Sequence, residues 1–87
     1  MDIEFDPAKA AANLKKHGVS FAEAATCLLD PMALVREDGD AAEEQRFVLL
    51  GMSASLRLLV IVYALRGESI RIISARKPTR KEEKSYA

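Results

Sequence analysis

The sequence predicts a single α+β domain, with two N-terminal helices and a short C-terminal helix packed against an antiparallel sheet, in the order β-α-α-β-β-β-β-α. Three observations support this fold class. The 87 residues are enough for one domain with one modest core. Alanine-rich, helix-forming sequence lies early in the chain, and short runs of branched and aromatic residues follow it. The links between the last strands are short, which favours an antiparallel meander.

The chain begins with a pattern typical of a strand followed by a helix. Ile3 and Phe5 alternate with acidic residues, as in a short strand with one buried face. Asp6-Pro7 then supplies an N-cap and a first helical residue. We expect a helix over Ala8–Lys16, because most of these residues are strong helix formers, and Gly18 is placed to end it.

A second helix and a short strand are expected next. The S-x-x-E form of Ser20–Glu23 is that of a capping box, which predicts a helix over Phe21–Leu29. Asp30-Pro31 would stop this helix. Met32–Arg36 is compatible with a short strand, and the acidic segment Glu37–Glu44 predicts a solvated turn.

The C-terminal half predicts three strands and a last helical turn. A strand is expected over Phe47–Leu50, broken near Gly51. Arg57–Leu65 is apolar at consecutive positions, which indicates a central strand with both faces covered. Ile70–Ala75 is rich in branched residues and predicts the last strand. The T-x-x-E form of Thr79–Glu82 is a further capping box and predicts a short final helix.

Charge is distributed unevenly along the chain. Residues 1–43 contain four Lys or Arg and nine acidic residues, a net charge of −5. Residues 44–87 contain nine Lys or Arg and four acidic residues, a net charge of +5. Such asymmetry suggests an anionic partner such as nucleic acid. The alternative is that the two halves simply neutralise each other in the folded molecule.

Several classes of protein are not supported by the sequence. One histidine and one cysteine, His17 and Cys27, cannot form a zinc site, and neither a Walker loop nor a G-x-G-x-x-G motif is present. We therefore expect no metal and no cofactor. Cys27 lies in an apolar helix and is interpreted as a core residue. The acidic N-terminus and the single cysteine favour a cytoplasmic location, and no apolar run is long enough to span a membrane.

The basic residues of the second half are candidates for binding phosphate. Arginine can hold a phosphate through two parallel hydrogen bonds. Arg46, Arg71 and Arg76 could stabilise a negatively charged transition state if they meet on one face of the sheet. Otherwise they form an exposed basic surface that binds an acidic protein or nothing. Further candidates for contacting RNA are Lys77, Arg80 and Tyr86.

His17 is the candidate for proton transfer. It follows Lys16 at the end of the first predicted helix, and histidine is the residue type best suited to acid–base chemistry near neutral pH. It could instead merely pack against or cap the helix end. Together with the arginines, such residues could support metal-free RNA cleavage, in which an activated 2′-OH attacks the adjacent phosphate.

The sequence also resembles the BrnT family of toxins from bacterial type II toxin–antitoxin operons. The resemblance covers nearly the whole chain and is strongest in two segments. The landmarks are Phe5–Lys9, Asn13–Ala24, Gln45–Phe47, Gly51 and Arg71–Arg76, which include N-x-x-K-H-G-V-x-F and R-I-I-S-A-R.

The resemblance implies a RelE-like fold and an RNA-cleaving toxin that inhibits translation. It also implies neutralisation by a BrnA-type antitoxin, whose ribbon-helix-helix domain binds operator DNA, so that the toxin would meet this DNA only indirectly. The site residues that it implies are Lys16, His17, Arg46, Arg71 and Arg76, with Arg80 and Tyr86 as further candidates.

Two other functions remain open at this point. The chain could be a non-catalytic partner-binding module of the same fold, which acts only within a DNA-binding repressor complex. It could also be a nucleic-acid-binding regulator in its own right, but no helix-turn-helix or ribbon-helix-helix pattern supports this.

Overall fold

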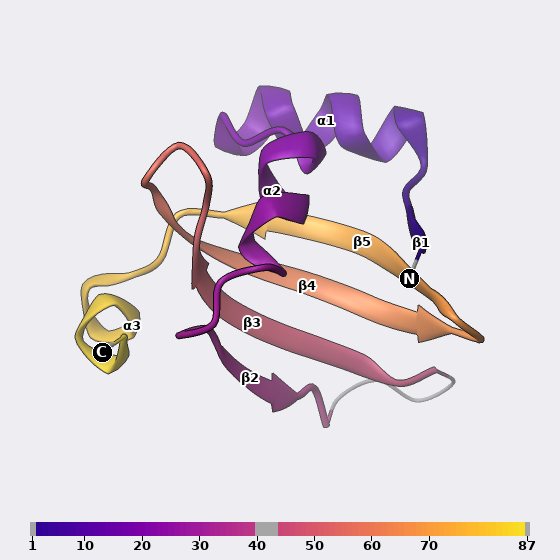
Figure 1. The fold of residues 1–87 in the computed structure, drawn as a ribbon. Helices are drawn as coiled ribbons and strands as arrows, with labels where there is room; N and C mark the ends of the chain where they lie inside the picture. The colour runs from indigo at the N-terminus through magenta and orange to yellow at the C-terminus, as the bar shows by residue number, and fades with distance from the viewer. Residues whose placement is uncertain (1, 40–43, 87) are drawn as a thin grey trace.

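The computed structural model describes residues 2–39 and 44–86. The elements follow one another in the predicted order (Figure 1), which confirms the α+β class. They are β1 (Asp2–Glu4), α1 (Pro7–His17), α2 (Phe21–Cys27), β2 (Leu34–Glu37), β3 (Arg46–Met52), β4 (Leu58–Arg66), β5 (Ser69–Arg76) and α3 (Arg80–Ser85).

The described strands form one sheet in the order β1-β5-β4-β3-β2. β2 to β5 are antiparallel neighbours, and β4 is the middle strand, as its continuous apolar run predicts. The sheet is mostly antiparallel, as predicted, and the exception is β1, which pairs in parallel with β5. Alternating residues reveal a strand but not its direction, because the direction depends on a partner from the other end of the chain.

α1 and α2 cover one face of the sheet (Figure 1) and enclose the core there. The helical layer supplies Val19, Phe21, Ala24 and Cys27, and the sheet supplies Leu49, Leu59, Ile61, Ile72 and Ala75. Because side chains alternate along a strand, the residues between these point to the opposite face. We call this opposite side the open face. It carries Arg46, Val48, Leu50, Val60, Val62, Ala64, Arg71, Ser74 and Arg76.

Several element boundaries differ from those predicted. α2 ends at Cys27 rather than Leu29, and Leu29 is 83% exposed. β2 is displaced towards the C-terminus, so that Glu37 pairs with Phe47 instead of belonging to the acidic turn. The middle of that predicted turn, residues 40–43, lies outside the described residues.

Gly51 lies within β3 and does not break it, contrary to the prediction. It pairs with Leu59 of β4. A Cβ atom at this position would lie 2.9 Å from Cδ2 of Leu49 and 3.2 Å from the carbonyl oxygen of Cys27. Gly51 therefore allows the end of α2 to lie against the strand.

α3 begins with the capping box that the sequence predicts. The Thr79 hydroxyl accepts a hydrogen bond from the Glu82 backbone N–H, and the Glu82 carboxylate accepts one from the Thr79 N–H. Its six residues include none that is buried. Within the described part of the chain, no helix is long and apolar enough to cross a membrane.

Candidate functional site

Arg46 and Arg71 lie in one row across the open face. Arg46 of β3 is opposite Ala64 of β4, and Ala64 is opposite Arg71 of β5. The Cα atoms of the two arginines are thus two strand spacings apart, about 10 Å. Side chains as long as arginine can approach one another over this distance, so that the row forms one basic surface.

Arg76 shares the open face but lies further along the sheet. It is opposite Val60, which precedes Ala64 by four residues on β4. Four strand residues span about 13 Å. The predicted grouping of three arginines is therefore correct for the face, but Arg76 stands apart from the row of Arg46 and Arg71.

Each of these arginines is paired with a carboxylate of the same chain. Arg71 lies 3.6 Å from Glu4, and Arg46 lies 3.3 Å from Glu44. The Arg76 guanidinium donates two hydrogen bonds to Glu82, at 2.8 and 2.9 Å. A phosphate that binds to any of these arginines therefore competes with a carboxylate that is already in place.

Asn13 fixes α1 to the end of β5. Its side-chain amide donates to the carbonyl oxygens of Val19 and Ala75, at 3.0 and 2.9 Å, and accepts from the Ala75 N–H at 3.1 Å. The residue is only 8% exposed. His17 follows Asn13 by one helical turn and so lies on the same side of α1. The contact with Ala75 thus directs this side of the helix towards the C-terminal end of β5.

The C-terminal ends of α1 and β5 lie at the same end of the molecule, because both elements run the same way (Figure 1). Basic residues are found at both ends, although α1 covers one face of the sheet and Arg76 points to the other, the open face. Lys16 is exposed and His17 is half-buried at the end of α1. Arg76 ends β5, exposed Lys77 follows it, and exposed Arg80 begins α3. We call Lys16, His17, Arg76, Lys77 and Arg80 the terminal cluster. Arg46 and Arg71 do not belong to it.

Tyr86 is placed by a hydrogen bond within the protein. Its hydroxyl donates to the Asp30 carboxylate at 2.5 Å, and this carboxylate also accepts from the N–H groups of Met32 and Met52. The Tyr86 hydrogen bond is the main cause that lowers the pKa of Asp30, and it raises the pKa of Tyr86. Tyr86 therefore ties α3 to the segment after α2, and its contact with RNA stays a prediction.

Arg57 also has a partner within the chain. Its Nε donates to Glu23 at 2.9 Å, and the Ser53 hydroxyl donates to the same carboxylate at 2.7 Å. The hydrogen bond from Arg57 is the main cause that lowers the pKa of Glu23. This network connects α2 with the turn between β3 and β4.

Two further expectations concern cysteine and metal ligands. Cys27 is fully buried, as expected for a core residue, and burial raises the pKa of its thiol to about 11. Among residues 2–39 and 44–86, no three His, Cys, Asp or Glu side chains are grouped so that they could hold a metal ion.

The family model described as "Ribonuclease toxin, BrnT, of type II toxin-antitoxin system" matches residues 5–82. The chain belongs to the BrnT toxin family. This confirms the resemblance noted in the sequence. A solved structure of the Brucella abortus ribonuclease toxin BrnT has a similar fold, with a TM-score of 0.71 and 25% sequence identity. The similarity covers 92% of this chain and 99% of that one. No curated protein sequence matches significantly.

The residue that positions the terminal cluster in this BrnT-family chain is one that sequence reasoning missed. Asn13 belongs to the N-x-x-K-H-G segment, but its role there was not assigned. The signal was available, because asparagine is a poor helix former inside an alanine-rich helix. The Arg57–Glu23 and Tyr86–Asp30 contacts had no such signal, since their partners lie 34 and 56 residues apart.

Glu82→Gln is expected to destabilise this BrnT-family fold in a pH-dependent way. The hydrogen bond from Arg76 is the main cause that lowers the pKa of Glu82 from 4.5 to about 2. A carboxylate with a lowered folded-state pKa stabilises the fold above its unfolded pKa and loses this effect as pH falls through its folded pKa. At pH 7 we expect a loss of about 1 kcal/mol, because the pair is partly screened by solvent.

The measurement is urea unfolding followed by circular dichroism at pH 7 and at pH values down to about 2. The difference between wild type and variant should shrink below pH 4.5 and disappear near pH 2. Glutamine at this position retains the capping hydrogen bond. Glu83→Gln, an exposed change on the same helix, is the control. A difference that stays constant with pH would contradict the role of the ion pair.

Proposed function

We propose that the chain is the toxin of a type II toxin–antitoxin system, an endoribonuclease that cleaves RNA without a metal ion and thereby inhibits translation. The observation that supports this most directly is that the chain belongs to a ribonuclease-toxin family and carries the terminal cluster. Its histidine and cations lie at or just after the C-terminal ends of α1 and β5. We expect the protein to act in the cytoplasm and to be neutralised by a BrnA-type antitoxin.

The proposed reaction uses only side chains of the protein and the RNA itself. A base takes the proton of the reacting 2′-OH, and an acid gives a proton to the leaving 5′-oxygen. His17 fills one of these two roles, and Lys16 precedes it in the sequence. The 2′-oxygen bonds to the adjacent phosphorus, and the bond from phosphorus to the 5′-oxygen breaks. Arg76 binds the phosphate as its negative charge increases in the transition state. The products are a 2′,3′-cyclic phosphate and a 5′-hydroxyl.

The remaining basic residues are proposed to hold the RNA strand. Lys77 and Arg80 lie next to Arg76 in sequence and are exposed, so they can contact neighbouring phosphates. Arg46 and Arg71 lie about 13 Å further along the open face. This distance corresponds to about two nucleotides of an extended strand, so both arginines can bind the same RNA away from the scissile phosphate.

The test is cleavage of a labelled oligonucleotide by the purified protein with and without EDTA. We expect the same rate in both and a cyclic phosphate on the product. A substrate with a single ribonucleotide in a DNA strand should be cut only after that nucleotide, because DNA lacks the 2′-OH. Loss of cleavage in EDTA that added magnesium restores would overturn the metal-free mechanism. A protein that binds its antitoxin but cleaves no RNA would be the non-catalytic module.

A further inference from the structure

β2 is an edge strand with an unusual amount of exposed apolar surface. Within the described residues it pairs with β3 on one side only. All four of its residues are exposed, and two of them are large and apolar: Leu34 at 43% and Val35 at 51%. Proteins commonly protect such an edge with charge, proline, a bulge or a covering segment, since it can pair with another chain. β2 is therefore a candidate for binding an additional strand.

The backbone groups available on this edge follow from the register. The Asp38 N–H donates to the Arg46 carbonyl oxygen at 2.8 Å. Hydrogen-bonded pairs recur at every second residue of an antiparallel ladder, so Arg36 and Leu34 also face β3. The N–H and C=O groups of Val35 and Glu37 consequently point away from β3. They are placed to bond an extended segment that lies along β2.

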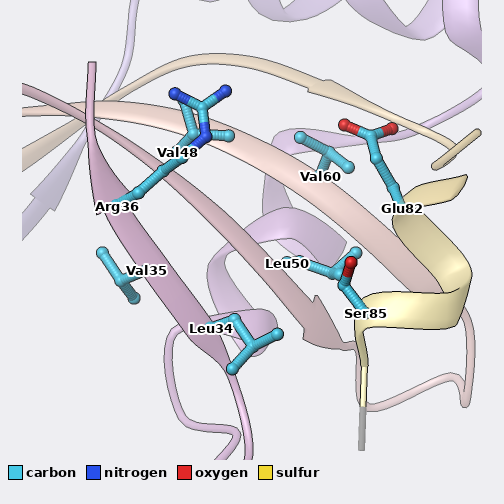
Figure 2. A pocket seen from close by; sticks show the side chains of 8 residues that line it. All are labelled: Leu34, Val35, Arg36, Val48, Leu50, Val60, Glu82 and Ser85. Atoms are coloured by element: carbon cyan, nitrogen blue, oxygen red, sulfur yellow. The ribbon is translucent and has the colours of Figure 1, made fainter. Parts of the chain in front are cut away.

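A groove of about 220 Å³ lies beside β2 on the open face (Figure 2). Its apolar floor consists of Val48, Leu50 and Val60. Leu34 and Arg36 of β2 line one side, and Glu82 and Ser85 of α3 line the other (Figure 2). A segment that pairs with β2 and then crosses over it onto the open face can place an apolar side chain in this groove.

The charge of the groove selects an acidic partner. Arg36 is exposed and has no ion pair among the described residues. Glu82, on the opposite side, is already held by Arg76. Among the described residues, the groove therefore offers one positive charge without an ion pair, next to an apolar floor. A carboxylate on the partner would be attracted to Arg36.

We propose that the antitoxin adds an extended segment to β2, with an apolar side chain in the groove and an acidic side chain against Arg36. This assignment rests on membership of a type II toxin–antitoxin family, which implies an antitoxin, and not on the cleavage mechanism. Strand addition would supply main-chain hydrogen bonds, and the groove would supply side-chain specificity.

A second copy of the chain is a poorer occupant of this surface. Pairing of two β2 strands joins four residues, about 13 Å of edge, and buries far less than the roughly 1,200 Å² of a stable interface. It would also place two Arg36 side chains on the same face, where their like charges repel each other.

The position of the groove couples antitoxin binding to inhibition. Glu82 lines the groove and bonds Arg76 of the terminal cluster. A bound segment would lie beside Arg76 and hinder the approach of an RNA phosphate. One contact surface would thus explain both complex formation and loss of toxicity.

The binding test uses the antitoxin encoded beside the toxin and isothermal titration calorimetry. Arg36→Glu and Leu34→Glu should each weaken binding about tenfold or more, because they place a like charge against the acidic segment or a charge in the apolar groove. Lys9→Glu is the control: it makes the same charge change at an exposed site on α1 and should alter the affinity by no more than about twofold. Circular dichroism checks that each variant is folded.

Amide hydrogen exchange distinguishes a partner that adds a strand to β2 from a partner that only lies over this surface. When the complex forms, exchange of the Val35 and Glu37 amide hydrogens should slow. The Leu34 and Arg36 amide hydrogens already face β3, so their exchange should change less. Unchanged affinity of both groove variants, or unchanged exchange at Val35 and Glu37, would place the antitoxin elsewhere and overturn the proposal. A toxin dimer that forms without antitoxin, and that the Leu34→Glu substitution dissociates, would also overturn the proposal. None of these measurements requires RNA cleavage, so they also distinguish this proposal from the proposed activity.

Discussion

Asn13→Ala is expected to lower the free energy of unfolding by about 3 kcal/mol. The substitution removes three hydrogen bonds and leaves the carbonyl of Val19 and both backbone groups of Ala75 without partners in a buried place. Each unsatisfied buried group costs about 1–3 kcal/mol, and the better helix propensity of alanine recovers only about half a kcal/mol. A chain of this size has a total stability at the low end of about 5–15 kcal/mol. The loss is therefore a large part of the total.

The measurement is urea unfolding at pH 7, with Lys9→Ala on the same helix as the control. Lys9 is exposed, so its replacement should change stability by less than about 0.5 kcal/mol. Hydrogen exchange should also show that the Ala75 amide loses its protection in the Asn13 variant. A stability loss below about 1 kcal/mol would mean that water or a shift of α1 satisfies these groups.

His17→Ala is expected to reduce RNA cleavage by about 10²–10⁴-fold, the usual contribution of a positioned acid or base. The fold should be retained, because His17 is at the helix end and is only half-buried. Lys15→Ala is a suitable control, since it removes a neighbouring basic side chain on the same turn. It should leave the cleavage rate within a few-fold of the wild type. The measurement is the single-turnover rate on a labelled RNA.

The same variants give a result in living cells. Induced expression of the wild type should arrest the growth of a bacterial host, and His17→Ala should relieve the arrest while Lys15→Ala does not. Equal toxicity of all three proteins would show that a residue other than His17 transfers the proton. A harmless wild type would favour the non-catalytic module.

The sequence was a good guide to the elements and a poor guide to the grouping of the site. Asp6-Pro7 and the capping box of Thr79–Glu82 predict helix starts that the structure contains. The alternation of Arg71 with its isoleucine neighbours predicts correctly that it faces away from the core. In contrast, the sequence grouped Arg46 with His17, although they lie near different ends of the sheet.

The ion pairs and hydrogen bonds of the candidate residues were also beyond sequence reasoning. Glu82 was interpreted only as part of a capping box, yet it also binds Arg76. Tyr86 is a candidate for contacting RNA, yet its hydroxyl bonds Asp30, 56 residues away. A side chain within a few residues of its partner leaves a recognisable spacing, whereas contacts between distant segments leave none.

By itself the sequence determined where helices and strands form and which strand is central. Caps, turns and burial periodicity act within a few residues, so their effect can be read locally. Only the tertiary structure decided that β1 runs parallel to β5 and that Asn13 brings α1 to the end of β5. It also decided that β2, with its exposed apolar residues, pairs on one side only among the described strands. These features depend on the register between segments far apart in the chain, and that register is set when the helices and the sheet bury their apolar faces together.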